Sequence, residues 1–411
     1  MSEPAAAPID KDAEQDAIGF VLALARALHR YGTPAHRLEE AMRWCCDRLG
    51  LEAEVFSTPT TIMMSFGAET ALRTRMLRVD GGELDLGKLA QVDALGDEVS
   101  ARRISPADGL HQLAAIVGGR PQFGRALSTL AHAMTCGAIA VFFGGGWQDV
   151  ALAGAIGLSL GFLAQVLSRS TDQTRVFELA GSALAAFAAG VASSVAPAVA
   201  PSLVTVAALL VLLPGMSLTV AMIELATRNP IAGTARLMSA VIVLLELVVG
   251  VALGERLASA LVDVGHGVPV PLPAWAPWVA LVVAAVGATI LVQAQRRAFG
   301  WILAACVAGY VGTRYGTQWL GDQLGALVGA LALGVLANVY ARWLKRPAQV
   351  VIVPAVLLLV PGSMGFRGMA SLLDRDTLTG VGTVFAMFVI AIAIVAGLLL
   401  SNAIVSPRRS L

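Results

Sequence analysis

Hydrophobic and polar residues follow two different patterns along this chain. Up to about residue 125, apolar residues recur at helical or alternating spacing among charged ones. From residue 126 onward, long apolar runs are separated by short polar segments. The whole chain of 411 residues is 57% hydrophobic and 14% charged, with a mean hydropathy of +0.74. Soluble proteins carry about 25% charged residues. The pattern predicts a polytopic α-helical membrane protein with a soluble α+β N-terminal domain.

The N-terminal domain is expected to cover residues 1–125, which hold 14 Lys and Arg and 18 Asp and Glu. Thr33 is predicted to cap a helix whose first residue is Pro34, and Gly50 to end that helix. The domain is large enough for a core of its own. The expected elements are helices at 16–30, 34–49, 85–100 and 106–118, with two or three strands within 52–79.

The apolar runs predict about ten transmembrane helices in two pseudo-repeated halves of five, residues 126–260 and 270–405. Each run is close to the roughly 20 residues that a helix needs to cross a bilayer. The expected spans are 126–143, 148–168, 176–195, 202–226, 237–257, 276–294, 299–315, 322–342, 350–372 and 381–404.

Loop charges indicate the orientation of these spans. If the N-terminal domain is inside, the inner loops and C-terminal tail carry eleven Lys and Arg and the outer loops three. The first residues lack the basic start and apolar core of a signal peptide. The excess of Arg over Lys, with abundant Ala and Gly, hints at a GC-rich bacterial genome. We therefore expect a multi-pass protein of a bacterial inner membrane with both termini in the cytoplasm.

An internal repeat relates the two halves. Residues 149–169 align with residues 322–342 at a constant offset of 173, with nine of 21 positions identical. The two Pro-Gly pairs, at Pro214 and Pro361, are offset by 147 instead. If the spans are counted correctly, the repeated helices run parallel and the two Pro-Gly spans run antiparallel.

The Pro-Gly pairs lie inside apolar runs, where a broken backbone is tolerated only against protein or a water-filled cavity. Two interrupted spans in corresponding halves point to a transporter's substrate site. The helix segment after each break presents free N–H groups, which suit a carboxylate. The predicted substrate-binding residues are Pro214, Gly215, Ser217, Thr219, Pro361, Gly362, Ser363 and Arg367. Arg367 could bind a substrate carboxylate or extend to the outer interface.

Five charged residues in or beside the spans are candidates for ion or proton coupling. Glu246 lies in the middle of a span, where a carboxylate is costly. Glu224 and Arg236 flank the turn after the first break and could simply pair with each other. Asp149 and Asp322 begin the repeated segments and could instead serve as helix caps. No spacing of Cys or His indicates a metal site, and no cofactor is expected.

The chain resembles the threonine/serine exporter family of bacterial and fungal membrane proteins over nearly its whole length. The segments that carry the resemblance are 31–40, 57–61, 142–149, 213–224 with 233–237, and 353–363. The family combines a soluble N-terminal domain with two membrane halves, and some relatives divide these parts between two proteins linked to succinate export.

The resemblance implies efflux of an amino acid or small acid from the cytoplasm, driven by the proton gradient, and does not by itself identify the substrate. The leading hypothesis is a proton-coupled secondary exporter of small hydroxyl amino acids, threonine or serine. The alternative is export of a small dicarboxylate such as succinate. A membrane enzyme with a hydrolytic N-terminal domain is a weaker alternative: the domain holds Ser57, His29 and His36, but it has no G-x-S-x-G or nucleotide-binding motif. We expect no enzyme activity and no nucleic-acid partner. The expected partners are a small-molecule substrate, protons and lipid, and a homo-oligomer remains open.

Overall fold

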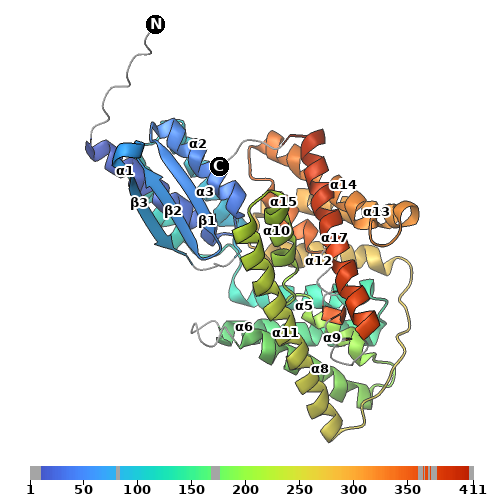
Figure 1. Ribbon diagram of the computed structural model, residues 1–411. Helices are drawn as coiled ribbons and strands as arrows, with labels where there is room; N and C mark the ends of the chain where they lie inside the picture. Colours follow the sequence, from blue (N-terminus) through green and yellow to red (C-terminus); the bar gives the residue numbers. More distant parts are fainter. Residues whose placement is uncertain are drawn as a thin grey trace.

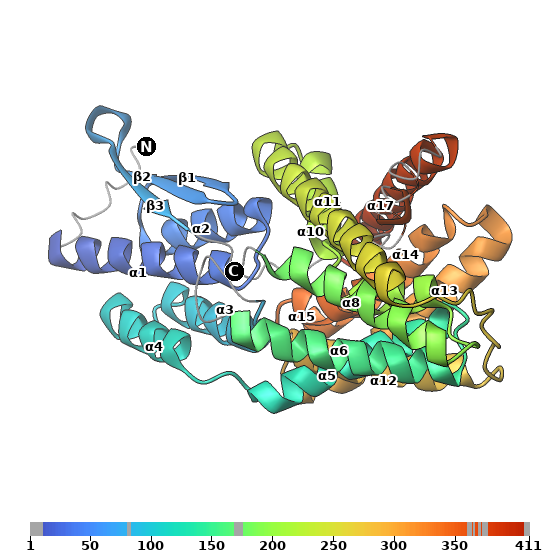
Figure 2. The same ribbon diagram turned by 90° about the horizontal axis from the view of Figure 1, so that it is seen from below.

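A computed structural model describes residues 11–79, 84–167, 176–359, 364, 366–368, 371 and 377–406. A mixed helix-and-sheet unit, here called the head, lies beside a larger assembly of helices (Figures 1 and 2). We call the end of the assembly beside the head the head end, and the opposite end the far end.

The head packs helices against one face of a three-stranded antiparallel sheet of order β1-β2-β3. Alternation along β2 buries Ile62, Met64 and Phe66 against the helices, while Met63 on the other face pairs with Met76. The elements of the head are α1 (Lys11–Arg30), α2 (Ala35–Leu49), β1 (Ala53–Thr58), β2 (Thr61–Phe66), η1 (Glu69–Ala71), β3 (Arg73–Arg78), α3 (Leu86–Ser100) and α4 (Pro106–Gly118). The α+β prediction is confirmed.

The predicted cap of α2 is wrong. The helix begins at Ala35, so Pro34 occupies the capping position and Thr33 lies outside the helix. No side chain of the capping residue bonds the first turn. At the other end Gly50 ends α2 as predicted, with φ 78° and its N–H bonded to the carbonyls of Cys46 and Asp47.

The remaining chain is helical, and six helices are long and apolar enough to span a membrane: α5 (Arg125–Phe142), α6 (Trp147–Leu167), α8 (Phe177–Val195), α11 (Pro230–Leu261), α14 (Gly325–Leu344) and α17 (Thr377–Ile404). The others are α9 (Pro201–Leu209), α10 (Gly215–Ala226), α12 (Ala276–Leu291), η2 (Arg296–Ala298), α13 (Phe299–Leu320) and α15 (Gln349–Val356). The structure therefore supports a helical membrane protein, with six rather than ten spans meeting both criteria among the described residues. Two of the predicted runs, 202–226 and 350–372, do not form single helices. The first is interrupted between α9 and α10, at Pro214 and Gly215, and in the second α15 ends at Val356.

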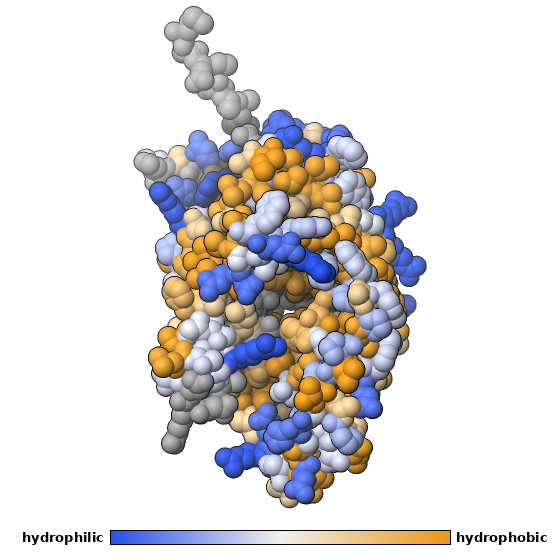
Figure 3. All heavy atoms as spheres, turned by 90° about the vertical axis from the view of Figure 1, so that its right-hand side faces the viewer, coloured by the Kyte–Doolittle hydropathy of each residue, from blue (hydrophilic) through white to orange (hydrophobic). Residues whose placement is uncertain are grey.

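Small residues let neighbouring helices approach closely. Gly250 and Gly254 of α11 lie against α8, and a Cβ on Gly250 would meet the Ser182 hydroxyl and the Leu179 carbonyl oxygen. This small-xxx-small arrangement is common where helices pack in lipid, since backbone contact replaces hydrophobic driving force. Apolar side chains face outward instead, and they cover much of the surface in Figure 3. Trp147 and Trp275 pack against each other at the far end, with ring centroids 6.4 Å apart.

The two broken spans enter from opposite ends. At the start of α9, the Ala200 N–H donates to Asp149 near the start of α6, at the far end. At the start of the second broken span, α15 packs against α3 of the head. The antiparallel arrangement expected of the two Pro-Gly spans is therefore observed.

Candidate functional site

The first break separates α9 from α10. The α9 side ends with the Leu213 N–H bonded to the Leu209 carbonyl, and α10 restarts with the Leu218 N–H bonded to the Pro214 carbonyl. Gly215 is buried, whereas Pro214 and Ser217 are half-buried. Thr219 turns its hydroxyl back to the Gly215 carbonyl at 3.1 Å and is 2% exposed. Thr219 is thus engaged within its own helix.

The second break itself, with Pro361, Gly362 and Ser363, lies outside the described residues. Beyond it, Arg367 is exposed and places its guanidinium 5.1 Å from the ring centroid of Phe143, which ends α5. Such stacking of a cation on an aromatic face is favourable. The ring therefore holds Arg367 at the far end of the helices.

A cavity of about 440 Å³ receives residues from both broken spans, and we call it the break cavity. Leu210 comes from the first break and residues 357–359 from the second. Helix α13 adds Tyr310, Thr313 and Arg314, and α5 adds Phe142 and Phe143. The break cavity is mainly apolar with a few polar groups, as small-molecule sites are.

Three polar residues of the break cavity escaped the sequence reasoning. The buried Thr313 Oγ1 has no hydrogen-bond partner among the described residues. Tyr310 packs its ring against Phe142 with centroids 5.6 Å apart. Arg314 is exposed at the rim. The sequence did carry a signal for them, because polar residues inside an otherwise apolar span often mark a functional site.

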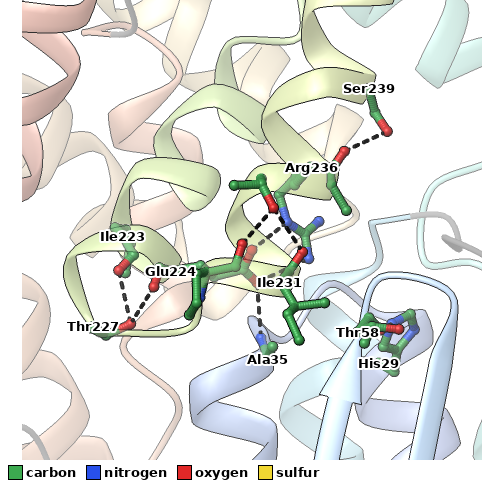
Figure 4. A network of polar contacts seen from close by, with 12 residues as sticks. His29, Ala35, Thr58, Ile223, Glu224, Thr227, Ile231, Arg236 and Ser239 are labelled. Carbon is green, nitrogen blue, oxygen red and sulfur yellow. Dashed lines mark hydrogen bonds and ion pairs between the residues drawn. The ribbon is translucent and has the colours of Figure 1, made fainter.

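Glu224, at the end of α10, joins the head to the membrane helices (Figure 4). Its carboxylate is fully buried. The Ala35 N–H, at the start of α2, donates to Oε1 at 3.1 Å. Arg236 of α11 donates from Nε to Oε2 at 3.1 Å and from Nη2 to Oε1 at 3.2 Å. Three donors from two helices, α2 and α11, satisfy one buried carboxylate of α10. The pairing of Glu224 with Arg236 that the sequence left open is therefore observed.

The turn between α10 and α11 brings these two residues together. Arg228 adopts a left-handed φ of 63°, and the Asn229 N–H returns to the Glu224 carbonyl at 2.8 Å. Gly233 then packs so closely on α10 that a Cβ there would lie 2.7 Å from Leu225 Cγ. Only a small residue at position 233 lets α11 approach α10 closely enough for Arg236 to reach Glu224. We call this contact the α10–α11 seam.

Two histidines of the head lie close enough to Glu224 for their charges to interact. Burial, and then the charge of Arg37, lower the pKa of His36 to about 4. Burial likewise lowers the pKa of His29, whose Nε2 donates to the Thr58 carbonyl at 3.2 Å. Both imidazoles are therefore neutral at neutral pH. No hydrogen bond joins a serine to a histidine among the described residues of the head, so the geometry offers no support for a hydrolytic centre.

The other predicted coupling residues are separated. Asp149 is 1% exposed and accepts from the Gly146 N–H at 2.8 Å and the Ala200 N–H at 2.9 Å, so it ties the starts of α6 and α9 together. Asp322, its counterpart in the repeat, is exposed because α14 begins only at Gly325. Glu246 is half-buried on α11 and lies close enough to Glu178 on α8 for the two charges to repel.

Comparison with known families agrees with this architecture. A family model of threonine/serine exporters matches residues 19–258, from the head through α11. The chain belongs to the threonine/serine exporter family. A second model of the same family matches residues 278–404, which hold α12 to α17. Membership supports a membrane transporter rather than an enzyme.

Similar proteins named pheromone-regulated membrane protein 10 occur in yeasts. That of Pichia sorbitophila is 29% identical over 86% of this chain and 37% of its own length, and that of Eremothecium gossypii is 26% identical over 89% and 51%. An uncharacterised protein of Schizosaccharomyces pombe is 27% identical over 85% and 48%. The chain thus spans about half or less of the length of these relatives. No solved structure matches the chain.

These relatives correct one expectation. They are eukaryotic membrane proteins, which overturns the assignment to a bacterial inner membrane. The hint came from residue composition, which reports codon usage rather than any contact in the fold. What the comparison supports is a membrane protein.

Proposed function

We propose that this transporter is a secondary active exporter that moves threonine and serine out of the cytoplasm. The carrying observation is that two interrupted spans run antiparallel and line one cavity from both sides. Interrupted helices of this kind form the substrate sites of many secondary transporters. The break cavity has apolar walls, a Thr313 hydroxyl with no partner in the described part of the chain, and nearby guanidinium groups. These features suit a small hydroxyl amino acid with its carboxylate.

The direct test is efflux from proteoliposomes loaded with labelled threonine, serine or succinate under an imposed pH gradient. We expect gradient-dependent efflux of threonine or serine above that of protein-free liposomes. A protonophore that collapses the gradient should reduce it to the rate of downhill leakage. Absence of gradient-dependent flux for all three solutes would refute the proposal.

A small dicarboxylate is the second candidate, and the placement of two arginines favours it. Arg314 lines the break cavity, and Arg367 stacks on Phe143, which lines it too. Two guanidinium groups can bind two carboxylates. Efflux of succinate without efflux of threonine or serine would select this candidate.

Proton coupling is proposed to use Glu246 together with Glu178. The two carboxylates lie close enough for their charges to repel, and carboxylates inside spans are the usual carriers of a coupled proton. By contrast, Glu224 and Asp149 already accept hydrogen bonds that join separate elements. We expect Glu246→Gln to abolish gradient-driven efflux while threonine/threonine exchange continues. Unchanged gradient dependence would exclude Glu246 from coupling.

A further inference from the structure

A second cavity, of about 180 Å³, lies between the head and the membrane helices, and we call it the head cavity. It has room for several waters. We propose that the head cavity binds a small zwitterionic amino acid that the head and the membrane helices hold jointly. The identity of the ligand rests on the proposed function. The polar residues that line it include Thr33, His36, Arg37 and Asp93 from the head, and Asn338 and Gln349 from the membrane helices.

The hydroxyl of Thr33 is the first observation that points to a ligand. Thr33 is 7% exposed, lines the head cavity, and its Oγ1 has no hydrogen-bond partner among the described residues. Buried hydroxyls are normally bonded. The Thr33 hydroxyl does not cap α2, because that helix begins at Ala35 and the Ala35 N–H donates to Glu224. A ligand in the cavity would supply the missing partner.

His36 adds a second unused polar atom beside the first. Its buried Nδ1 has no partner within the described chain, and its side chain lines the same cavity. Since burial and Arg37 lower the pKa of His36 to about 4, the ring is neutral at neutral pH. A neutral imidazole can donate or accept a hydrogen bond without adding charge.

The charged residues of the wall have opposite signs. Arg37, which also pairs with Glu40 at 3.4 Å, brings a guanidinium whose side chain is 35% exposed, and Asp93 brings a carboxylate that is 1% exposed. Both line the head cavity. An α-amino acid carries a carboxylate and an ammonium group, which complement this pair. A dicarboxylate would be repelled by Asp93, so the head cavity favours the zwitterion.

The membrane side of the head cavity is held rigidly. Asn338 is 1% exposed, and its Nδ2 donates at 2.9 Å to both Asn402 Oδ1 and the Val405 carbonyl. Val220 and Ile223 of α10 give an apolar wall, and Ile223 directly precedes Glu224. A ligand here would therefore contact the head and α10 at once, beside the hydrogen bond that joins them.

Equilibrium binding of labelled threonine to the purified full-length protein in detergent tests the proposal. Thr33→Val keeps the volume and removes the hydroxyl, so Kd should rise about fivefold, as for one hydrogen bond. Arg37→Gln should raise Kd by roughly 10- to 100-fold, as for a charged one. The matched controls are Thr60→Val and Arg30→Gln, at exposed positions of the head that do not line the cavity. They should leave Kd unchanged.

The outcomes separate this proposal from the exporter proposal. If the protein exports threonine but both cavity variants bind it like the wild type, the head cavity is refuted and the exporter stands. If binding weakens in both variants while liposomes show no efflux, the exporter is refuted and the cavity stands. Unchanged thermal unfolding of Thr33→Val is expected, because its hydroxyl has no described partner to lose; a binding loss accompanied by unfolding in both variants would count against the cavity.

Discussion

The backbone N–H of Ala35 donates to Glu224 Oε1 at 3.1 Å across 189 positions of sequence. A helix of the head is thus capped by a carboxylate from a membrane helix. Negative charge near a helix start is favourable, because the first turn has free N–H groups. The same carboxylate binds Arg236 through two nitrogens, so one side chain fixes both the α10–α11 seam and the docking of the head.

Glu224→Gln is expected to weaken both connections. Arg236 would lose its charged partner, and removing one member of a buried pair costs about 3–5 kcal/mol. We expect roughly 2–3 kcal/mol, since the Arg236 side chain remains 27% exposed and can recover some hydration. Thermal unfolding measures the loss, and hydrogen exchange at the Ala35 amide should accelerate. Glu54→Gln, an exposed position on β1, is the control. Unaltered exchange at Ala35 would show that Glu224 does not hold the head.

Gly250→Ala should destabilise the α8–α11 seam by about 1–3 kcal/mol, the usual cost of overpacking. The added Cβ would meet the Ser182 hydroxyl and, at 2.5 Å, the Leu179 carbonyl oxygen. Because the carbonyl belongs to the backbone, adding Ser182→Ala should not restore stability. Gly382→Ala on α17 is the matched control, since nothing lies within 4 Å of its Cβ. Equal melting temperatures for the two alanine variants would contradict the close approach.

The low pKa of His36 makes the stability of the fold sensitive to acid. The unfolded chain binds a proton near pH 6.5, whereas folded His36 does so only near pH 4. His36 therefore imposes no cost above pH 6.5, and stability falls as the pH drops from 6.5 towards 4. The loss approaches roughly 3 kcal/mol at 1.36 kcal/mol per pH unit. His36→Gln should flatten this part of the pH dependence of unfolding, whereas His111→Gln, at an exposed position on α4, should not. Parallel curves for wild type and His36→Gln would contradict the prediction.

Thr313→Val is expected to separate transport from stability. The variant keeps the shape of the side chain and removes a buried hydroxyl that has no partner in the described part of the chain. Stability should stay the same or rise, because the unpaired group is gone. If substrate supplies the partner in the break cavity, KM for threonine efflux should rise about fivefold. Reduced stability with normal efflux would place the hydroxyl in the fold rather than in the substrate site.

Local signals in the sequence were sufficient to predict most helices and strands. The predictions that failed depend on contacts between residues far apart in the sequence. The Pro-Gly pair at 214 predicted the break between α9 and α10, because proline lacks a backbone N–H whatever its tertiary surroundings. Thr33 looked like a cap, but Glu224 supplies the cap from another helix. The repeat paired Asp149 with Asp322, yet only Asp149 has the start of α9 beside it. Thr313 and Arg314 escaped notice because α13 carries no Pro-Gly pair, and only packing brings it to the breaks.

The head is bonded to both membrane halves. Besides Ala35 and Glu224, the N–H groups of Leu86 and Gly87 donate to the carbonyls of Val292 and Gln293, at 2.9 and 3.1 Å, where α12 ends. A displacement of one half against the other must therefore stretch or break one of these two attachments. The head is therefore a mechanical link between α10 and the end of α12. Any movement of α10 against α12 would then be resisted by hydrogen bonds to a soluble unit, and not by contacts among the membrane helices alone.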